Sequence, residues 1–336
     1  LGVSQGETER ARRGGAGGAV PFPARQRAGL VAGHAMAAWI PITLFAAFVQ
    51  NLRFMLQKHL KATRLSTGGA TFARFVFSAP LVAAIVAGYL VVTGQGLPGF
   101  TPRFWVFAMA GGLAQILATM CVVALFSHRN FAVGITFKKT EVLQTALVGF
   151  VVLGEGVSPG GLLAILVGFV GVVLLSDAPS AGGPPWHRRL FNRAAGLGLA
   201  SGVLFAVSAT GYRGATLALG LDDVFLRAAL TLAVVTAAQS LAMAAWLAWR
   251  EKGEIARVLR HWRVAGLVGV TSMLGSGGWF LAFTLQKAAY VKALGQVELI
   301  FSFLAATFVF KEKTSPRELV AMGLLSASIL ILILAL

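Results

Sequence analysis

The sequence contains an internal duplication that aligns without a gap. Residues 126–159 match residues 283–316 at a constant spacing of 298 − 141 = 157, and both copies end in Ser-Pro. The alignment places Glu141 opposite Glu298, each inside an otherwise apolar run. An ionisable group in such a run is energetically unfavourable in a membrane and usually marks a functional site. The chain is therefore predicted to consist of two related halves with matching acids.

The composition places both halves in a bilayer. Hydrophobic residues make up 57% of the chain and charged residues 12%, with a mean hydropathy of +0.78, whereas soluble proteins carry about 25% charged residues. The net charge of +17 arises mainly from Lys and Arg between apolar runs, as in loops at a membrane surface. With no soluble basic domain, we expect no nucleic-acid partner. The single cysteine, Cys121, excludes a disulfide framework and a cysteine-based metal site,, and we expect no metal or cofactor.

A helix needs about 20 mostly apolar residues to cross a bilayer. That length predicts ten transmembrane helices, at residues 37–58, 68–92, 104–127, 131–154, 158–177, 194–217, 222–249, 264–286, 289–310 and 315–336. Each half holds five of them, an odd number, so the second half enters the membrane from the opposite side. The predicted fold class is an all-α membrane protein with ten transmembrane helices in two inverted five-helix repeats.

These helices define the predicted domain organisation. The repeats cover residues 37–177 and 194–336, and a Pro- and Gly-rich linker at 178–193 is expected to lie along the membrane interface,. Residues 1–35 are rich in Gly, Ala and Arg without a hydrophobic period, which is typical of disorder,. Because Met36 directly precedes the first apolar run, we expect residues 1–35 to be a disordered or non-native leader.

Glu141 and Glu298 carry the strongest functional signal. Residues three or four apart share a helix face, so Lys138 lies on the same stripe as Glu141. In one hypothesis the acids bind substrate or exchange protons. In the other, neighbouring Lys or Arg neutralises each acid and the pairs only fix helix packing. The sequence leaves both hypotheses open.

Basic residues outnumber acidic ones in and near the predicted spans, which favours a solute with a carboxylate or another anionic group. Arg74 and Arg227 each follow a Phe by two residues, at a spacing of 227 − 74 = 153, and are predicted to have equivalent roles in the two halves. Trp279 lies mid-helix behind three glycines, where cavity lining and lipid-facing packing are alternatives. The predicted substrate- or proton-binding residues are Glu141, Glu298, Lys138, Lys292, Gln296, Arg53, Gln50, Arg74, Arg227 and Trp279.

A second pair of acids, Glu155 and Glu312, follows the fourth helix of each half and precedes a Ser-Pro dipeptide. Ser at an N-cap and Pro at the first helical position start a helix on backbone grounds. We therefore interpret this pair as structural.

The turns around these acids, Leu153-Gly154-Glu155-Gly156 and Phe310-Lys311-Glu312-Lys313, together with the two five-helix halves, resemble the EamA family of the drug/metabolite transporter superfamily. The likeness covers residues 37–336, and Lys311 replaces the usual Gly in the second copy. The resemblance implies a multi-pass permease of the bacterial inner membrane, often an exporter of amino acids or other metabolites, that alternates access to a central cavity. It implies no particular solute.

These observations predict a secondary transporter of small metabolites, an exporter of amino-acid-like or anionic solutes coupled to protons, acting as a monomer or homodimer. We expect no catalytic residues. A primary pump is disfavoured because the sequence has no G-x-x-x-x-G-K-[ST] phosphate loop,. Two alternatives remain, an intramembrane lipid-modifying enzyme and a non-transporting sensor or scaffold. The enzyme would need clustered His or Asp, whereas the five His are scattered,.

The membrane orientation is also open at this stage. Lys and Arg concentrate after the first, fifth, seventh and ninth predicted helices, and the positive-inside rule places those connections in the cytoplasm and both termini outside. The resemblance instead implies both termini in the cytoplasm. A reporter fused to the C-terminus distinguishes the two.

Overall fold

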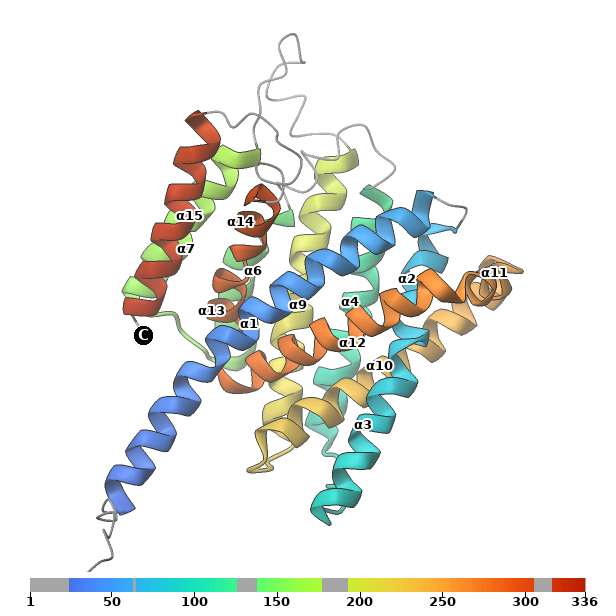
Figure 1. The fold of residues 1–336 in the computed structure, drawn as a ribbon, viewed down its shortest axis with the longest axis horizontal. Coiled ribbons are helices and arrows are strands. Elements are labelled where there is room, and N and C mark those ends of the chain that lie inside the picture. The colour runs from blue at the N-terminus through green and yellow to red at the C-terminus, as the bar shows by residue number, and fades with distance from the viewer. Residues whose placement is uncertain (1–23, 63–64, 126–137, 177–192, 305–315, 336) are drawn as a thin grey trace, which may run out of the picture. The chain divides into compact units, whose positions relative to one another are not determined.

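The structure, a computed structural model, describes residues 24–62, 65–125, 138–176, 193–304 and 316–335 (Figure 1). Within these ranges all regular secondary structure is helical. One compact unit comprises Ala38–Leu336, and of the other, Leu1–Ala37, only the beginning of the first helix is described. That helix begins at Ala24, ahead of the predicted start at residue 37.

The helices of the first half are α1 (Ala24–Ala62), α2 (Thr67–Val76), α3 (Ser78–Thr93), α4 (Pro102–Leu125), α6 (Glu141–Leu153) and α7 (Pro159–Ser176). Those of the second half are α9 (Arg193–Ala218), α10 (Val224–Arg250), α11 (Glu254–Arg260), α12 (Trp262–Leu285), α13 (Ala288–Leu294), α14 (Val297–Leu304) and α15 (Pro316–Leu334).

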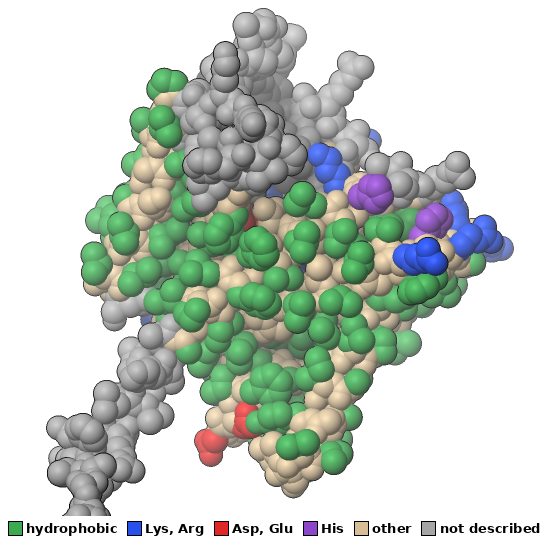
Figure 2. Space-filling view, in the orientation of Figure 1, with side chains coloured by type: hydrophobic (Ala, Val, Ile, Leu, Met, Phe, Trp, Pro, Cys, Tyr) green, Lys and Arg blue, Asp and Glu red, His purple; other side chains and the backbone are tan. Residues whose placement is uncertain are grey.

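The described part of the chain has the length and polarity pattern of a membrane protein. Five helical segments are long and apolar enough to cross a bilayer, Ala38–Leu60, Thr67–Thr93, Pro102–Leu125, Val224–Arg250 and Trp262–Leu285. In Figure 2 hydrophobic side chains cover most of the visible face, while Lys, Arg and His gather at the end where α11 lies. The protein is therefore an all-helical, multi-pass membrane protein.

Two predicted continuous spans are interrupted. The span at 68–92 breaks at Phe77 into α2 and α3. Pro80 lacks the N–H that would bond to the carbonyl of Val76. Ser78 Oγ donates to the carbonyl of Arg74 at 2.8 Å. The Pro80 ring and the Ser78 side chain therefore both weaken the backbone hydrogen bonding of the helix at this point. Apolar periodicity could not detect this break, because the hydrophobic pattern continues through it.

The second interruption corrects the predicted span at 289–310, which divides into α13 and α14 at Gly295-Gln296. The backbone N–H of Gln296 bonds to Ala293 at 3.2 Å and that of Glu298 to Gly295 at 3.2 Å. Both bonds join residues three apart, so the chain tightens as in a 3₁₀ turn, a feature that often marks a functional hinge. In the first half a turn at residues 139–140 likewise precedes α6.

The N-caps of α2 and α10 occupy equivalent places. Ser66 Oγ accepts the N–H of Gly69 at 2.9 Å, and Asp223 Oδ1 accepts that of Leu226 at 2.9 Å. Their spacing, 223 − 66 = 157, equals that of the duplicated acids. Counted from these caps, Arg74 corresponds to residue 74 + 157 = 231, a threonine, whereas the pairing of Arg74 with Arg227 uses a spacing of 153 and stays a prediction.

Helices α7 and α15 lie side by side (Figure 1) and pack through small residues. A Cβ atom added to Gly168 would lie 2.6 Å from Ser328 Oγ, and one added to Gly171 would lie 3.0 Å from the carbonyl oxygen of Ala321. Ser328 Oγ also donates to the carbonyl of Ala164 at 2.7 Å. In lipid, the burial of apolar surface contributes little to helix association, so the van der Waals contacts made by such close approach stabilise the helix pair.

Gly171→Leu is expected to destabilise the protein by about 1–3 kcal/mol, because the added side chain meets backbone atoms that cannot move aside. Thermal unfolding of the purified protein in detergent measures the effect. The matched control is Gly323→Leu on α15, where an added Cβ meets nothing within 4 Å. Equal melting temperatures for the two variants would contradict the packing assignment.

A short helix, α11, lies in the predicted polar connection between Arg250 and Arg263. Its first residue, Glu254, is fully buried. Glu254 Oε1 accepts the backbone N–H of Ser66 at 2.6 Å, and Glu254 Oε2 lies 2.9 Å from Arg257 Nη2. This carboxylate therefore joins the connection after α10 to the start of α2, which places the connections after the first and seventh predicted helices together.

Glu254→Ala is expected to lower stability by about 1–3 kcal/mol, because it leaves the part-buried N–H of Ser66 without its acceptor,. The melting temperature in detergent, compared with that of the exposed-site control Lys252→Ala, tests this. If Glu254→Ala has the same melting temperature as Lys252→Ala, the carboxylate does not hold the two connections together.

Candidate functional site

The two duplicated acids stand at the same kind of backbone position. Glu141 is the first residue of α6, and Glu298 lies in the first turn of α14, each directly after an interruption of the helix. The N-terminus of a helix carries a partial positive charge that stabilises a nearby carboxylate. Each interruption thus begins a new helix whose N-terminus is a favourable place for the acid.

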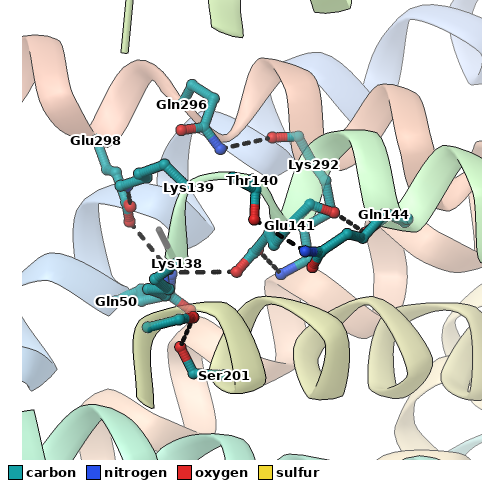
Figure 3. Close-up of polar contacts among 12 residues, drawn as sticks. Gln50, Lys138, Lys139, Thr140, Glu141, Gln144, Ser201, Lys292, Gln296 and Glu298 are labelled. Atoms are coloured by element: carbon teal, nitrogen blue, oxygen red, sulfur yellow. Dashed lines mark hydrogen bonds and ion pairs between the residues drawn. The ribbon is translucent and has the colours of Figure 1, made fainter. Parts of the chain in front are cut away.

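Glu141 is 4% exposed and is flanked by two lysines. Lys292 Nζ of α13 lies 2.8 Å from Glu141 Oε1, and Lys138 Nζ lies 3.6 Å from Glu141 Oε2 (Figure 3). Lys292 also lies over the ring of Trp279, with Nζ 4.9 Å from the ring centroid. The carboxylate of the first half is therefore neutralised mainly by a lysine of the second half.

Glu298 has the complementary arrangement. Its Oε1 forms an ion pair with Lys139, and its Oε2 accepts a hydrogen bond from Gln50 Nε2 of α1 at 3.2 Å (Figure 3). Both partners belong to the first half. Together the two acids make a crossed set of contacts, in which each half contributes one acid and one lysine to the other.

The crossed ion pairs agree with both hypotheses for the acids. They neutralise buried charge and hold the halves together, which is the structural role. They also place each carboxylate where protonation would remove its charge and release a lysine of the opposite half. The arrangement therefore has the chemistry of a proton-dependent contact between the halves.

The predicted arginines have different surroundings. Arg74 is 3% exposed and donates to three hydroxyl groups, Thr119 at 2.9 Å, Ser272 at 3.2 Å and Ser276 at 3.3 Å. Within the described ranges no carboxylate forms an ion pair with it, so Arg74 pairs with neither Glu141 nor Glu298.

Arg53 and Arg227 do not join the acids either. Arg53 is 2% exposed and lies over the ring of Phe54, with Cζ 4.6 Å from the centroid. Arg227 lies near the start of α10, and its carbonyl accepts the hydroxyl of Thr231 at 2.7 Å. Of the three predicted arginines, Arg74 is the one that lines a cavity, together with Gln50 and Lys292.

A cavity lies between helices of both halves, beside the crossed ion pairs. It has about 350 Å³ of space unoccupied by atoms, a volume that includes the part open to solvent. Four predicted site residues line it: Gln50, Arg74, Trp279 and Lys292. Gln296 and Lys139 instead line a neighbouring space of about 250 Å³ next to Gly168 of α7.

The sequence prediction missed the polar network that supports one wall of the main cavity. Gln239 Nε2 donates to Gln115 Oε1 at 3.0 Å, and the hydroxyl of Tyr212 donates to the same oxygen at 2.9 Å. Tyr212 and Gln115 line the cavity. Gln115 is an isolated polar residue in an apolar run, and that was the signal by which it could have been found.

Glu155 also contacts the other half. Its carboxylate lies 2.5 Å from Arg213 Nε of α9, and Arg213 Nη1 donates to the carbonyls of Phe283 and Gln286 at 2.7 and 2.8 Å. This geometry supports a structural role for Glu155. Glu312 lies outside the described residues. In the described part of the chain, no cluster of three His, Cys, Asp or Glu residues could hold a metal ion.

Comparison with known proteins shows a similarity in fold only. Among the solved structures that resemble the chain, one described only as "Crystal structure of protein" has a TM-score of 0.64 and 14% sequence identity, over 89% of this chain and 97% of its own. No family model matches the chain, and no curated protein matches it. The resemblance to the EamA family therefore stays a prediction.

The contact between Glu141 and Lys292 is expected to contribute a coupling free energy of about 1 kcal/mol or more, because the groups touch and both are buried. A double-mutant cycle with Glu141→Gln and Lys292→Met, followed by thermal unfolding, measures it. The comparison cycle pairs Glu141→Gln with Lys138→Met, whose atoms lie farther apart. Equal coupling in the two cycles would show that Lys292 is not the main partner.

Proposed function

We propose that the protein is a secondary transporter of small metabolites in the bacterial inner membrane, an exporter of amino-acid-like or anionic solutes coupled to protons. The observation that carries the proposal is the crossed pair of contacts, Lys292 with Glu141 and Lys139 with Glu298, beside a cavity between the halves. Discontinuous helices at a site shared by two repeats are the usual construction of a substrate site in such carriers.

The proposal includes ten spans in two inverted repeats, and the packing of α7 on α15 supports it. At the spacing of 157, Leu325 corresponds to Gly168 and Ser328 to Gly171. A Cβ added to Gly168 would lie 2.6 Å from Ser328 Oγ, and one added to Gly171 would lie 3.2 Å from Leu325 Cγ. Contacts that are reciprocal in this way are characteristic of a two-fold axis.

The charges around the cavity support an anionic cargo. Arg74 and Lys292 line the cavity, and both acids next to it are engaged by lysines. Buried cations without a full set of counter-charges are unfavourable in a protein interior. A bound anion removes part of that unfavourable energy, so the site favours a negatively charged solute over a neutral one of equal size.

In this mechanism the ion pairs hold the halves in one arrangement. Protonation of Glu298 removes the negative charge that attracts Lys139, and the two halves can separate at that contact. Burial favours the neutral form of a carboxyl group and nearby lysines favour the charged form, so small movements of the lysines change the proton affinity of the acid. Proton binding and opening of the cavity are thereby linked.

The test is flux in liposomes that contain the purified protein, with a solute first identified by comparing the metabolites of cells with and without the gene. The Glu141→Gln, Glu298→Gln double variant keeps side-chain shape and removes both titrating groups. We expect it to fold and to lose pH-driven flux by at least about tenfold, which corresponds to about 1.4 kcal/mol in the barrier.

The control variant is Asp222→Asn, an exposed acid in the loop before α10, which is expected to transport normally. Full pH-dependent flux by the double variant would leave the two acids as packing residues. Absence of flux for every solute in the unaltered protein would remove the transporter proposal itself.

A further inference from the structure

One wall of the main cavity carries a positive charge that no described carboxylate balances. Arg74 and Lys292 both line the cavity, and no acidic side chain does within the described ranges. Lys292 has Glu141 at 2.8 Å. Arg74 has three hydroxyl partners, which accept its hydrogen bonds but carry no charge. An anion in the cavity would supply the missing counter-charge.

Unused hydrogen-bond donors accompany that charge. A guanidinium has five N–H groups, and the hydroxyls of Thr119, Ser272 and Ser276 accept three of those of Arg74. Trp279 is 8% exposed, and its indole Nε1–H has no hydrogen-bond partner in the described part of the chain. A carboxylate has two oxygens that accept such donors, and charge-assisted bonds of this kind are strong.

The rest of the lining is largely aromatic. The rings of Tyr212 and Phe280 have centroids 4.2 Å apart, and those of Trp279 and Phe283 are stacked 5.9 Å apart at 25°. All four side chains line the cavity. Aromatic surfaces favour another ring in an offset or edge-to-face arrangement, so the apolar part of the ligand is expected to be a planar ring.

Among the described residues, no acidic side chain lines the cavity to bind a second, positive group of the ligand. Lys292 and Lys138 flank Glu141, and Lys139 pairs with Glu298. The ammonium group of an α-amino acid would enter a cavity whose charged lining residues are both cations, and it would meet unfavourable electrostatics and no counter-charge.

We propose that the main cavity binds an aromatic carboxylate that lacks an amino group, with Arg74 and the indole N–H of Trp279 holding the carboxylate. The inference rests on the proposed transport function and narrows its substrate class. It separates acids of this kind from the zwitterionic amino acids and from uncharged aromatic solutes.

The test is binding to the purified full-length protein by calorimetry, with four probes of similar size. The probes are 3-phenylpropanoate, phenylalanine, 3-phenylpropanol and 3-cyclohexylpropanoate, so that the ammonium, the charge and the ring are varied one at a time. We expect 3-phenylpropanoate to bind at least about tenfold more tightly than each of the other three, a ratio that is readily measured.

Two variants connect the binding to the named groups. Trp279→Phe removes the N–H and keeps an aromatic ring, and it is expected to weaken 3-phenylpropanoate binding about three- to tenfold. Trp249→Phe, at a tryptophan that is 74% exposed and outside the cavity, is the control. Arg74→Gln is expected to abolish binding of 3-phenylpropanoate. If Arg74→Gln does not fold, Trp279→Phe and the four probes still test the proposed site.

The proposal is overturned if phenylalanine binds as tightly as 3-phenylpropanoate, if Trp279→Phe binds like Trp249→Phe, or if 3-phenylpropanoate does not bind. The liposome experiment separates this failure from failure of the transport function. pH-driven flux of another solute would keep the transporter and refute the aromatic acid, whereas absence of any flux would refute both.

Discussion

The attraction between the buried acids and lysines is the interaction on which the rest of the structure depends. An unpaired carboxylate or ammonium in a low-dielectric interior is strongly unfavourable. Glu141 and Glu298 are tolerated because Lys292 and Lys139 meet them from the opposite halves. Neither half could bury its own acid in the same way alone. The crossed pairs therefore make the two halves dependent on each other, because each buried acid meets a lysine of the opposite half.

Two features of the backbone accompany these contacts: the helix interruptions before the acids and the small residues between neighbouring helices. The interruptions before Glu141 and Glu298 place each acid at a helix start, where free N–H groups favour negative charge. Small residues also allow neighbouring helices to pack closely. Gly211 of α9, for example, packs directly on Gly111 of α4, where an added Cβ would lie 3.0 Å from the Cα of Gly111. A bulky residue there would push α9 away from α4 and change the shape of the cavity wall that includes Tyr212.

The selectivity for charge that we propose for the cavity rests on the same geometry. The acids near it have partners, while Arg74 is held by neutral hydroxyls. The hydrogen bonds among Gln239, Gln115 and Tyr212 keep one wall in place. Each side chain in this network orients a neighbouring side chain and occupies one of its hydrogen-bonding groups. A cavity with fixed donors and an unbalanced cation is organised in advance for an anion, because little side-chain freedom is lost when the anion binds.

The sequence by itself determined the helical membrane class, the spacing of 157 and the matching positions of the two acids, because apolar length, local duplication and charge in an apolar run are local properties of the chain. The breaks at Phe77 and Gly295-Gln296 were not predicted, since hydrophobicity continues across them while backbone bonding does not. Only the tertiary structure decided which cation meets which acid. Lys292 and Glu141 are 151 residues apart (292 − 141), and a lysine three positions away, Lys138, was the nearer candidate by sequence. The choice depends on how α13 packs against α6, and long-range packing also left Arg74 beside the cavity with hydroxyl partners and no ion pair to a described carboxylate.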